Sequence, residues 1–279
     1  MDADSIRTLQ TTAAETRKQL LRIIYDAGGG HTGGALSSVD ILVSLYFHTL
    51  KYDPKNPEDP ARDRFILSKG HSVEGFYCVL ARAGYFPQEE LRTYGKFGSR
   101  LYGHPTMKVP GVEVPTGALG HGLPIGVGMA IAGKRDNSEY RVFVLMGDGE
   151  QAEGSVWEAA MSAAHFKLDN LIGIIDYNQL QISGTVDSVM GLSPLDERWR
   201  SFGWNVVEVA GNNIEQLTGL FDRLPLVQGK PTLVLAHTTK GKGVSFIENQ
   251  AVWHHHVPTK EQYEQAIEEL DLSIKELVR

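Results

Sequence analysis

Two polar segments, each directly after an apolar run, contain the residues of this chain best suited to chemistry. The run 141–146 ends in a Gly-Asp-Gly turn centred on Asp148, and the run 170–176 is followed by Asn178. Carboxylate and amide oxygens are hard ligands of the kind that Mg²⁺ takes from proteins, with water and phosphate completing its coordination. The glycines beside Asp148 let backbone N–H groups approach a phosphate closely. The pattern predicts a divalent metal and a diphosphate bound at one place.

The elements around these segments explain how they would meet. Both apolar runs are typical of parallel strands that are buried on both faces. Residues 155–166, between the runs, have apolar residues at helical spacing, so the unit is predicted to be strand, turn, helix and strand. Ligands of open α/β sheets bind beyond the carboxyl ends of the strands. Asp148 and Asn178 are therefore expected at the same edge of one sheet.

The rest of the chain alternates in the same way. Amphipathic helices are expected at 5–27, 38–50, 73–84, 119–133, 150–166, 213–223 and 259–278, and strands near 64–67, 141–146, 170–176, 204–209 and 232–236. This alternation predicts an α/β fold, with a mostly parallel sheet and helices on both faces. We expect residues 1–279 to form a single domain, on which the first and last helices pack. The connections 86–118 and 178–203 show no clear period and are expected to be functional loops.

Histidine or lysine stands beside glycine in several further loops. These are Gly30-His31, Leu67-Ser68-Lys69-Gly70-His71, Gly103-His104-Pro105, Lys240-Gly241-Lys242-Gly243 and the nearby Trp253-His254. A single histidine of this kind is more often a surface or capping residue, and a single lysine is more often a solvated charge. Several of them in glycine-flanked loops favour a shared ligand, because imidazole and ammonium groups that converge on a diphosphate are stabilising.

Taken together, these segments resemble the transketolase family over almost the whole chain, from His31 to about Pro258. The motif resembling the family's thiamine-diphosphate motif comprises Gly147-Asp148-Gly149, Glu153-Gly154, Trp157-Glu158-Ala159, Asn170-Leu171, Asp176, Asn178, Gln181 and Gly184. The segment 116–120 resembles the loop that holds the aminopyrimidine ring. The resemblance implies a thiamine-diphosphate-binding fold, with thiamine diphosphate as cofactor and Mg²⁺ as its metal, Ca²⁺ or Mn²⁺ being alternatives.

The resemblance also implies roles for individual residues. The metal ligands would be Asp148, Asn178 and the backbone carbonyl of Leu180. The diphosphate would be surrounded by Lys69, His71, Gly149, Lys240 and His254, and the pyrimidine would contact Gly117 and Leu119. The candidates for proton transfer are His31, His71, His104 and His254, of which His31 and His104 would face the sugar. Glu153 resembles a glutamate at the interface between paired cofactor sites, and its alternative is a carboxylate in the first turn of a helix.

The resemblance covers the amino-terminal module of the family's single-chain enzymes, which hold the cofactor between two modules. After Pro258 only one amphipathic helix is expected, with no candidate for the glutamate that protonates the aminopyrimidine. We therefore expect half of a split transketolase that transfers a two-carbon ketol group from a ketose phosphate to an aldose phosphate. A separate C-terminal subunit would carry the pyrimidine-binding module, in a heterotetramer with two copies of each chain.

Two alternatives to a split transketolase remain open. One is half of another thiamine-diphosphate enzyme, resembling deoxyxylulose-phosphate synthase or a transketolase for an unusual sugar or sulfonate. The other is a non-catalytic scaffold, which is disfavoured because every matched metal and diphosphate position holds a competent residue.

Composition narrows the class of partner. The chain has 27 Lys and Arg against 34 Asp and Glu, a net charge of −7, so neither nucleic acid nor an anionic membrane is an expected partner. No apolar run approaches the ~20 residues that span a bilayer, and no targeting signal is recognised, so a cytoplasmic protein is expected. The single cysteine, Cys78, lies in an apolar stretch and is expected to be buried.

Overall fold

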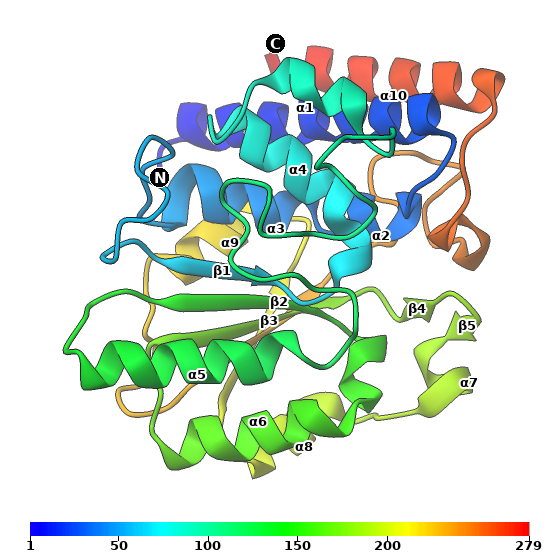
Figure 1. The fold of residues 1–279 in the computed structure, drawn as a ribbon. Helices are drawn as coiled ribbons and strands as arrows, with labels where there is room; N and C mark the ends of the chain where they lie inside the picture. The colour runs from blue at the N-terminus through cyan, green and yellow to red at the C-terminus, as the bar shows by residue number, and fades with distance from the viewer. Residues whose placement is uncertain (279) are drawn as a thin grey trace.

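The computed structural model of the chain describes residues 1–278, which are built around one five-stranded sheet (Figure 1). The order across the sheet is β1 (Arg64–Leu67), β2 (Val142–Gly147), β3 (Leu171–Tyr177), β7 (Thr232–His237) and β6 (Asn205–Ala210). Every neighbouring pair is parallel. The five predicted strands and the parallel sheet are confirmed, with limits that differ by at most one residue.

The central strands bring the polar segments to one edge of the sheet. All residues of β2 and β3 are buried except Gly147 and Tyr177, the last residue of each, which are half-buried. In the register of these two strands Gly147 lies opposite Asp176. Because the strands are parallel, the turn after β2 and the segment after β3 leave the sheet on the same side, at the right in Figure 1. The predicted meeting of Asp148 and Asn178 at one sheet edge is confirmed.

Helices cover both faces of the sheet, as predicted (Figure 1). The upper layer contains α1 (Ala3–Ala27), α2 (Thr32–Ser37), α3 (Val39–Ser44), α4 (Val73–Arg82), α9 (Ile214–Phe221) and α10 (Lys260–Val278). The lower layer contains α5 (Gly122–Arg135), α6 (Gly154–His165) and α8 (Leu195–Ser201). Each layer has its own apolar cluster: Phe143 and Leu145 of β2 pack into the upper one, and Val144 and Met146 into the lower. Cys78 is fully buried in the upper cluster, as expected.

The prediction of one helix at 38–50 was wrong in two respects: the helical segment starts earlier, and it is divided into separate elements. The chain is helical from Thr32, and α2 and α3 are followed by a π-helical segment, η1 (Leu45–Thr49). Glycine disfavours helices, so Gly33 and Gly34 concealed the first turn. Close packing explains why glycine suits position 33, since a Cβ there would lie 3.0 Å from the carbonyl oxygen of Trp253. Tertiary contact here overrides local propensity.

The two long connections contain short elements that have too few turns to show a period. Residues 178–203 hold a small antiparallel hairpin followed by α7 (Val186–Met190) and α8, and residues 86–118 hold the 3₁₀ segment η3 (Gln88–Thr93). The hairpin strands are β4 (Leu180–Gln181) and β5 (Gly184–Thr185), and the other 3₁₀ segments are η2 (Gly70–Ser72), η4 (Gly149–Ala152) and η5 (Ala251–His254). These short elements were not predicted from the sequence, and they do not test the expectation that the connections are functional loops.

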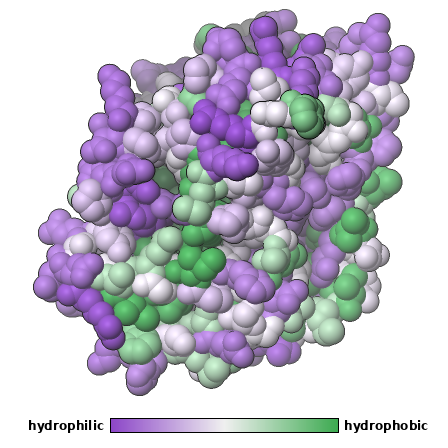
Figure 2. All heavy atoms as spheres, in the orientation of Figure 1, coloured by the Kyte–Doolittle hydropathy of each residue, from purple (hydrophilic) through white to green (hydrophobic). Residues whose placement is uncertain are grey.

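The upper and lower parts of the face seen in Figure 2 differ in polarity. In Figure 2, hydrophilic residues cover much of the upper part, where α1 and α4 lie, whereas apolar residues gather lower down in the region of α5. The apolar side chains Ile125, Met129 and Ile131 of α5 are only partly buried by the lower cluster. Among residues 1–278, no helix combines the length and the apolar character needed to cross a bilayer.

Two glycines of α5 provide a test of how tightly this helix packs. A Cβ on Gly126 would lie 2.6 Å from a methyl group of Val144, whereas a Cβ on Gly128 would meet nothing within 4 Å. We expect Gly126→Ala to lower the free energy of unfolding by about 1–3 kcal/mol through overpacking. Its matched control, Gly128→Ala, is expected to raise it by about 0.5–1 kcal/mol, because alanine favours the helix. Urea denaturation of the two variants measures both values, and equal effects would contradict the close packing of α5 on β2.

Candidate functional site

A cavity of about 380 Å³ lies at the carboxyl edge of the sheet, beside the turn after β2. It is lined by residues from loops that follow β1, β2, β3 and β7, together with the N-terminal part of α2 and the segment before α5. The predicted site residues among them are Lys69, His71, Gly117, Leu119, Asp148, Gly149, Glu153, Asn178, Leu180, Lys240 and His254. His31 and His104 are outside this lining: the ring of His31 contacts those of His71 and His254, and the ring of His104 contacts that of His31. The structure thus brings the predicted residues together.

The three predicted metal ligands offer one carboxylate, one amide oxygen and one backbone carbonyl. The Asp148 carboxylate accepts hydrogen bonds from the backbone N–H groups of Gly149 and Gln179. The side-chain oxygen of Asn178 accepts from the N–H of Leu180 at 3.1 Å, and the Leu180 carbonyl accepts from the Lys240 ammonium at 2.9 Å. Neighbouring loops therefore present only oxygen atoms, which is the donor type that Mg²⁺ prefers.

Electrostatics at Asp148 also fits a cation. Burial, with a further contribution from the nearby Asp176, raises the pKa of Asp148 from 3.8 to about 6. A bound cation would stabilise the ionised carboxylate and remove this penalty. Within residues 1–278, no group of three or more His, Cys, Asp or Glu side chains is arranged around a common metal position. A metal at Asp148 would therefore depend on amide and carbonyl oxygens and on phosphate.

Under the cavity, Lys69 forms a buried ion pair with Asp176, the second-last residue of β3. Asp176 is fully buried and also accepts hydrogen bonds from the hydroxyl groups of Ser37 and Thr238. Burial alone would raise the pKa of Asp176, but Lys69 and these hydrogen bonds hold it below its ordinary value. The sequence indicated Asp176 only as part of a motif and did not reveal this partnership, although a carboxylate at the end of an apolar strand was a signal.

Lys240 and His254 form a second basic contact. The Lys240 ammonium lies 2.9 Å from Nδ1 of His254. Burial and the nearby Lys69 lower the pKa of Lys240 from 10.5 to about 8, and burial and Lys240 lower the pKa of His254 from 6.5 to about 3. His254 is therefore a neutral acceptor for the lysine. An anion in the cavity would relieve the repulsion between Lys69 and Lys240, which fits a diphosphate.

Glu150 joins three loops of the site and was missed in the sequence. Its side chain accepts hydrogen bonds from the N–H groups of Gly120 and Gly147, at 2.8 and 3.0 Å, and from the Ser68 hydroxyl. Burial raises the pKa of Glu150 despite these hydrogen bonds. Glu153, by contrast, caps α6 without a side-chain hydrogen bond and is exposed at the cavity.

The loop before α5 has a shape that requires glycine at position 117. Gly117 has φ +134°, and a Cβ there would lie 2.5 Å from the ring of His104. Gly70 packs closely against the same loop, since a Cβ added to Gly70 would lie 2.7 Å from the backbone nitrogen of Gly117. The loop therefore lies directly against the loop after β1, where Leu119 reaches the cavity.

Five histidines form a cluster with His31 at its centre. The His31 ring centroid lies 5.6 Å from that of His71, 5.8 Å from those of His104 and His254, and 4.6 Å from that of His255. The rings of His71 and His254 stack at 5.3 Å. Burial lowers the pKa of His71, and the positive charge of Lys69 lowers it further. Burial likewise lowers the pKa of His104, with a smaller electrostatic contribution from His31. His71 and His104 are therefore favoured as neutral imidazoles beside the cavity.

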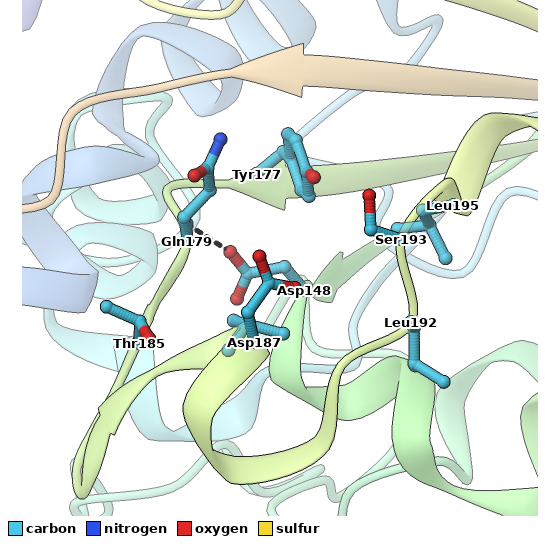
Figure 3. A pocket seen from close by; sticks show the side chains of 9 residues that line it. Asp148, Tyr177, Gln179, Thr185, Asp187, Leu192, Ser193 and Leu195 are labelled. Atoms are coloured by element: carbon cyan, nitrogen blue, oxygen red, sulfur yellow. Dashed lines mark hydrogen bonds between the residues drawn. The ribbon is translucent and has the colours of Figure 1, made fainter.

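A second, much smaller cavity lies on another side of Asp148 (Figure 3). It measures about 30 Å³ and is bordered by Tyr177, Asp187 and Ser193 among others. This volume holds about one or two water molecules. The larger cavity, which contains Lys69 and Lys240, is therefore the one suited to an organic diphosphate.

Comparison with known proteins identifies the family. Residues 9–272 match the family profile described as "Transketolase, thiamine diphosphate binding domain". The chain belongs to the transketolase family. The resemblance recognised in the sequence, and the assignment of a thiamine-diphosphate-binding domain at the family's N-terminal end, are confirmed.

The relatives of this transketolase-family chain include enzyme subunits of similar length. It is 50% identical to an apulose-4-phosphate transketolase subunit of Phocaeicola vulgatus, over 98% of this chain and 97% of that one. It is 53% identical to the protein of the same name in Actinobacillus succinogenes, over 94% and 95%. It is 42% identical to "6-deoxy-6-sulfo-D-fructose transketolase subunit SqwG" of Clostridium sp., over 94% and 96%.

Longer transketolases match over less than half of their own length. The human transketolase is 38% identical over 96% of this chain and 43% of its own length. The structure of the transketolase from Leishmania mexicana superposes with a TM-score of 0.86 at 27% identity, over 97% of this chain and 45% of that one. The fold class predicted from the sequence, that of the thiamine-diphosphate-binding transketolases, is confirmed.

Lys240 provides a test of the anion site. We expect Lys240→Met to weaken thiamine diphosphate binding about 10- to 100-fold, because a charge-assisted hydrogen bond to a phosphate is worth about 1.5–3 kcal/mol. Lys242→Met is the matched control, since the Lys242 side chain is 40% exposed and pairs with Glu248 outside the cavity. Calorimetric titration with thiamine diphosphate and Mg²⁺ measures both affinities. Equal affinities of the two variants would contradict a diphosphate at Lys240.

Proposed function

We propose that this chain is the cofactor-binding subunit of a two-chain, thiamine-diphosphate- and Mg²⁺-dependent transketolase, with Ca²⁺ or Mn²⁺ able to replace Mg²⁺. The observation that carries the proposal is the single cavity that unites two lysines, the Asp148 and Asn178 oxygens and a histidine cluster. These are the groups required for a metal diphosphate next to a sugar. We further propose that residues 1–279 form one domain and act in the cytoplasm.

In this proposal each group has a defined task. Asp148, Asn178 and the Leu180 carbonyl hold the metal, and Lys69, His71, Gly149, Lys240 and His254 hold the diphosphate. Gly117 and Leu119 border the pyrimidine, and Glu153 lies near the partner side of the cofactor. When bound, thiamine diphosphate supplies the carbanion stabilisation that ketol transfer requires. His31, His71, His104 and His254 bind sugar hydroxyl groups and move their protons, for which neutral imidazole is suited.

A partner chain would cover the apolar rim of the cavity. Ile182 and Met190 line the cavity and are 65% and 57% exposed. Exposed apolar side chains at a site mark an interaction surface. We propose that a C-terminal transketolase subunit, carrying the pyrimidine-binding module, packs here in a heterotetramer with two copies of each chain. The relatives that match over nearly their full length and are called subunits support this arrangement.

Co-expression with that candidate partner tests the proposal. We expect ketol transfer from a ketose phosphate to an aldose phosphate only when both chains, thiamine diphosphate and Mg²⁺ are present. Removal of the metal by EDTA should abolish the transfer, and Mg²⁺ should restore it. A full rate with either chain alone would contradict a shared site, and a tight but inactive complex would favour the scaffold alternative.

The donor substrate can be narrowed by the relatives. Two of them, at 50% and 53% identity, are called apulose-4-phosphate transketolase subunits. We therefore propose apulose 4-phosphate as the donor to test first, with 6-deoxy-6-sulfo-D-fructose and xylulose 5-phosphate as comparison donors. The highest kcat/KM identifies the donor, and a preference for either comparison donor would overturn this choice.

A further inference from the structure

A buried carboxylate behind the histidine cluster has no role in the function proposed so far. Glu74 lies on the first turn of α4 and its side chain is fully buried. Its Oε1 accepts a hydrogen bond from the backbone N–H of His31 at 2.9 Å and another from the Tyr94 hydroxyl at 2.7 Å. Its Oε2 has no hydrogen-bond partner among residues 1–278. A buried acceptor without a donor costs about 1–3 kcal/mol, so this oxygen calls for an explanation.

The ring of His31 is a further side-chain group beside the Glu74 carboxylate. Nδ1 of His31 is also buried and, within the described part of the chain, also without a partner. It lies 3.9 Å from Oε1 of Glu74, and the His31 side chain as a whole is 18% exposed. The ring nitrogen without a partner therefore lies beside the carboxylate whose other oxygen, Oε2, also has none.

His31 differs from the other histidines of the cluster in this respect. Among the described residues, it is the one member of the cluster with a carboxylate within 4 Å. His71 and His254 instead face the positive charges of Lys69 and Lys240, which disfavour their protonated forms. A carboxylate on one ring nitrogen fixes the tautomer of an imidazole and stabilises its protonated form. His31 is the member of the cluster whose ring has a carboxylate beside it.

Among the described residues, no cationic side chain competes with His31 for the Glu74 carboxylate. Its other polar neighbours are neutral, since burial raises the pKa of Tyr94, Tyr77 and Cys78, with the charge of Glu74 adding to the effect. In the part of the chain that the structure describes, no lysine or arginine lies within salt-bridge distance of Glu74. The groups that respond to or contact this charge are His31, His104, Tyr77, Cys78 and Tyr94.

We propose that Glu74 is a positioning residue for His31: it accepts a hydrogen bond from Nδ1–H, so that Nε2 offers its lone pair to a hydroxyl group of the sugar. The proton then passes from the substrate hydroxyl to Nε2, while the Nδ1 proton remains on the ring and Glu74 remains ionised. The return of that proton to the product restores neutral His31. This inference rests on the proposed function only in taking a sugar as the substrate.

Two substitutions separate the charge of Glu74 from its hydrogen bond. Glu74→Gln keeps the shape and an acceptor oxygen but removes the charge, whereas Glu74→Met removes both. In the assembled enzyme, we expect Glu74→Gln to lower kcat about 10-fold, with the affinity for thiamine diphosphate unchanged. The acid limb of its pH profile of kcat/KM should move to lower pH by about half a unit to one unit, because loss of a nearby negative charge disfavours the protonated imidazole. Glu74→Met should lower kcat further.

A matched control is present at the surface, where His48 pairs with Asp222 at 2.7 Å. Asp222→Asn should leave kcat and the pH profile unchanged. A profile that does not move in Glu74→Gln, whatever its effect on stability, would overturn the role of Glu74.

Nitrogen NMR of histidine-labelled protein tests the same pair without turnover. Above about pH 8, where an ordinary imidazole is neutral, we expect His31 to carry its proton on Nδ1 in the wild type and in Glu74→Gln. In Glu74→Met the proton should move to Nε2. The His31 signal is assigned by its loss in His31→Gln. A wild-type proton on Nε2 would overturn the Glu74 proposal, whereas a wild-type complex without ketol transfer would overturn only the proposed function.

Discussion

Asp148→Ala is expected to abolish metal-dependent cofactor binding and to lower kcat/KM at least about 10³-fold, which corresponds to about 4 kcal/mol. The reason is that Asp148 is the one charged group among the three predicted metal ligands, the others being the oxygens of Asn178 and Leu180. Calorimetric titration and ketol-transfer kinetics on the assembled complex measure the two effects. Full activity of the variant with Mg²⁺ and thiamine diphosphate would contradict a metal at this position.

Asp187→Ala is the matched control for Asp148. Asp187 is exposed on α7 and borders the small cavity next to Asp148, but its side chain does not line the larger cavity (Figure 3). We expect Asp187→Ala to change the cofactor affinity and kcat/KM less than about twofold, because an exposed carboxylate interacts weakly through water.

The apo chain offers a further readout of the same substitution. With a pKa of about 6 in the folded chain against 3.8 as its ordinary value, Asp148 binds a proton more tightly in the folded state. Its contribution to the free energy of unfolding is therefore lost as the pH rises from about 4 to about 6. Asp148→Ala should flatten this part of the stability profile, and denaturation at several pH values would show it.

The sequence revealed those site residues whose side-chain chemistry is accompanied by a recognisable local pattern. Asp148 and Asn178 each follow a long apolar run, and parallel strands necessarily bring such positions to one edge. The histidine and lysine loops were recognised by their glycines. The strands of the sheet were predicted to within one residue because buried parallel strands are apolar throughout.

The features that were missed depend on contacts between distant segments. Glu150 looks like an ordinary carboxylate in a turn, and Glu74 looks like one in a helix, yet both are buried and accept hydrogen bonds from distant parts of the chain. The helix at Thr32 was concealed because two glycines lower helical propensity. Only the packing of Gly33 against Trp253 explains why glycine stands there. Pairings of this kind have no local period from which they could be predicted.

Asp176→Asn is expected to lower the free energy of unfolding by about 3 kcal/mol, because it leaves the Lys69 ammonium buried without its counter-charge. Asparagine fits the pocket of Asp176: its oxygen can accept from Ser37, Lys69 and Asn178, and its amide can donate to the Thr238 hydroxyl. The substitution therefore removes charge while the shape and hydrogen bonds remain. Denaturant unfolding measures the loss, and the control Glu264→Gln in the exposed pair with Lys260 should change stability by less than about 0.5 kcal/mol.

Combining Asp176→Asn with Lys69→Met separates stability from function. If the cost of Asp176→Asn comes from an uncompensated buried charge, removal of that charge should return most of the lost free energy, so the two effects should not add. The double variant should nevertheless bind thiamine diphosphate at least about 10-fold more weakly than the wild type, because the anion site has lost one of its two lysines. Additive losses of stability would show that Asp176 acts through packing alone. Unchanged cofactor affinity in the stable double variant would show that Lys69 serves the fold and not the diphosphate.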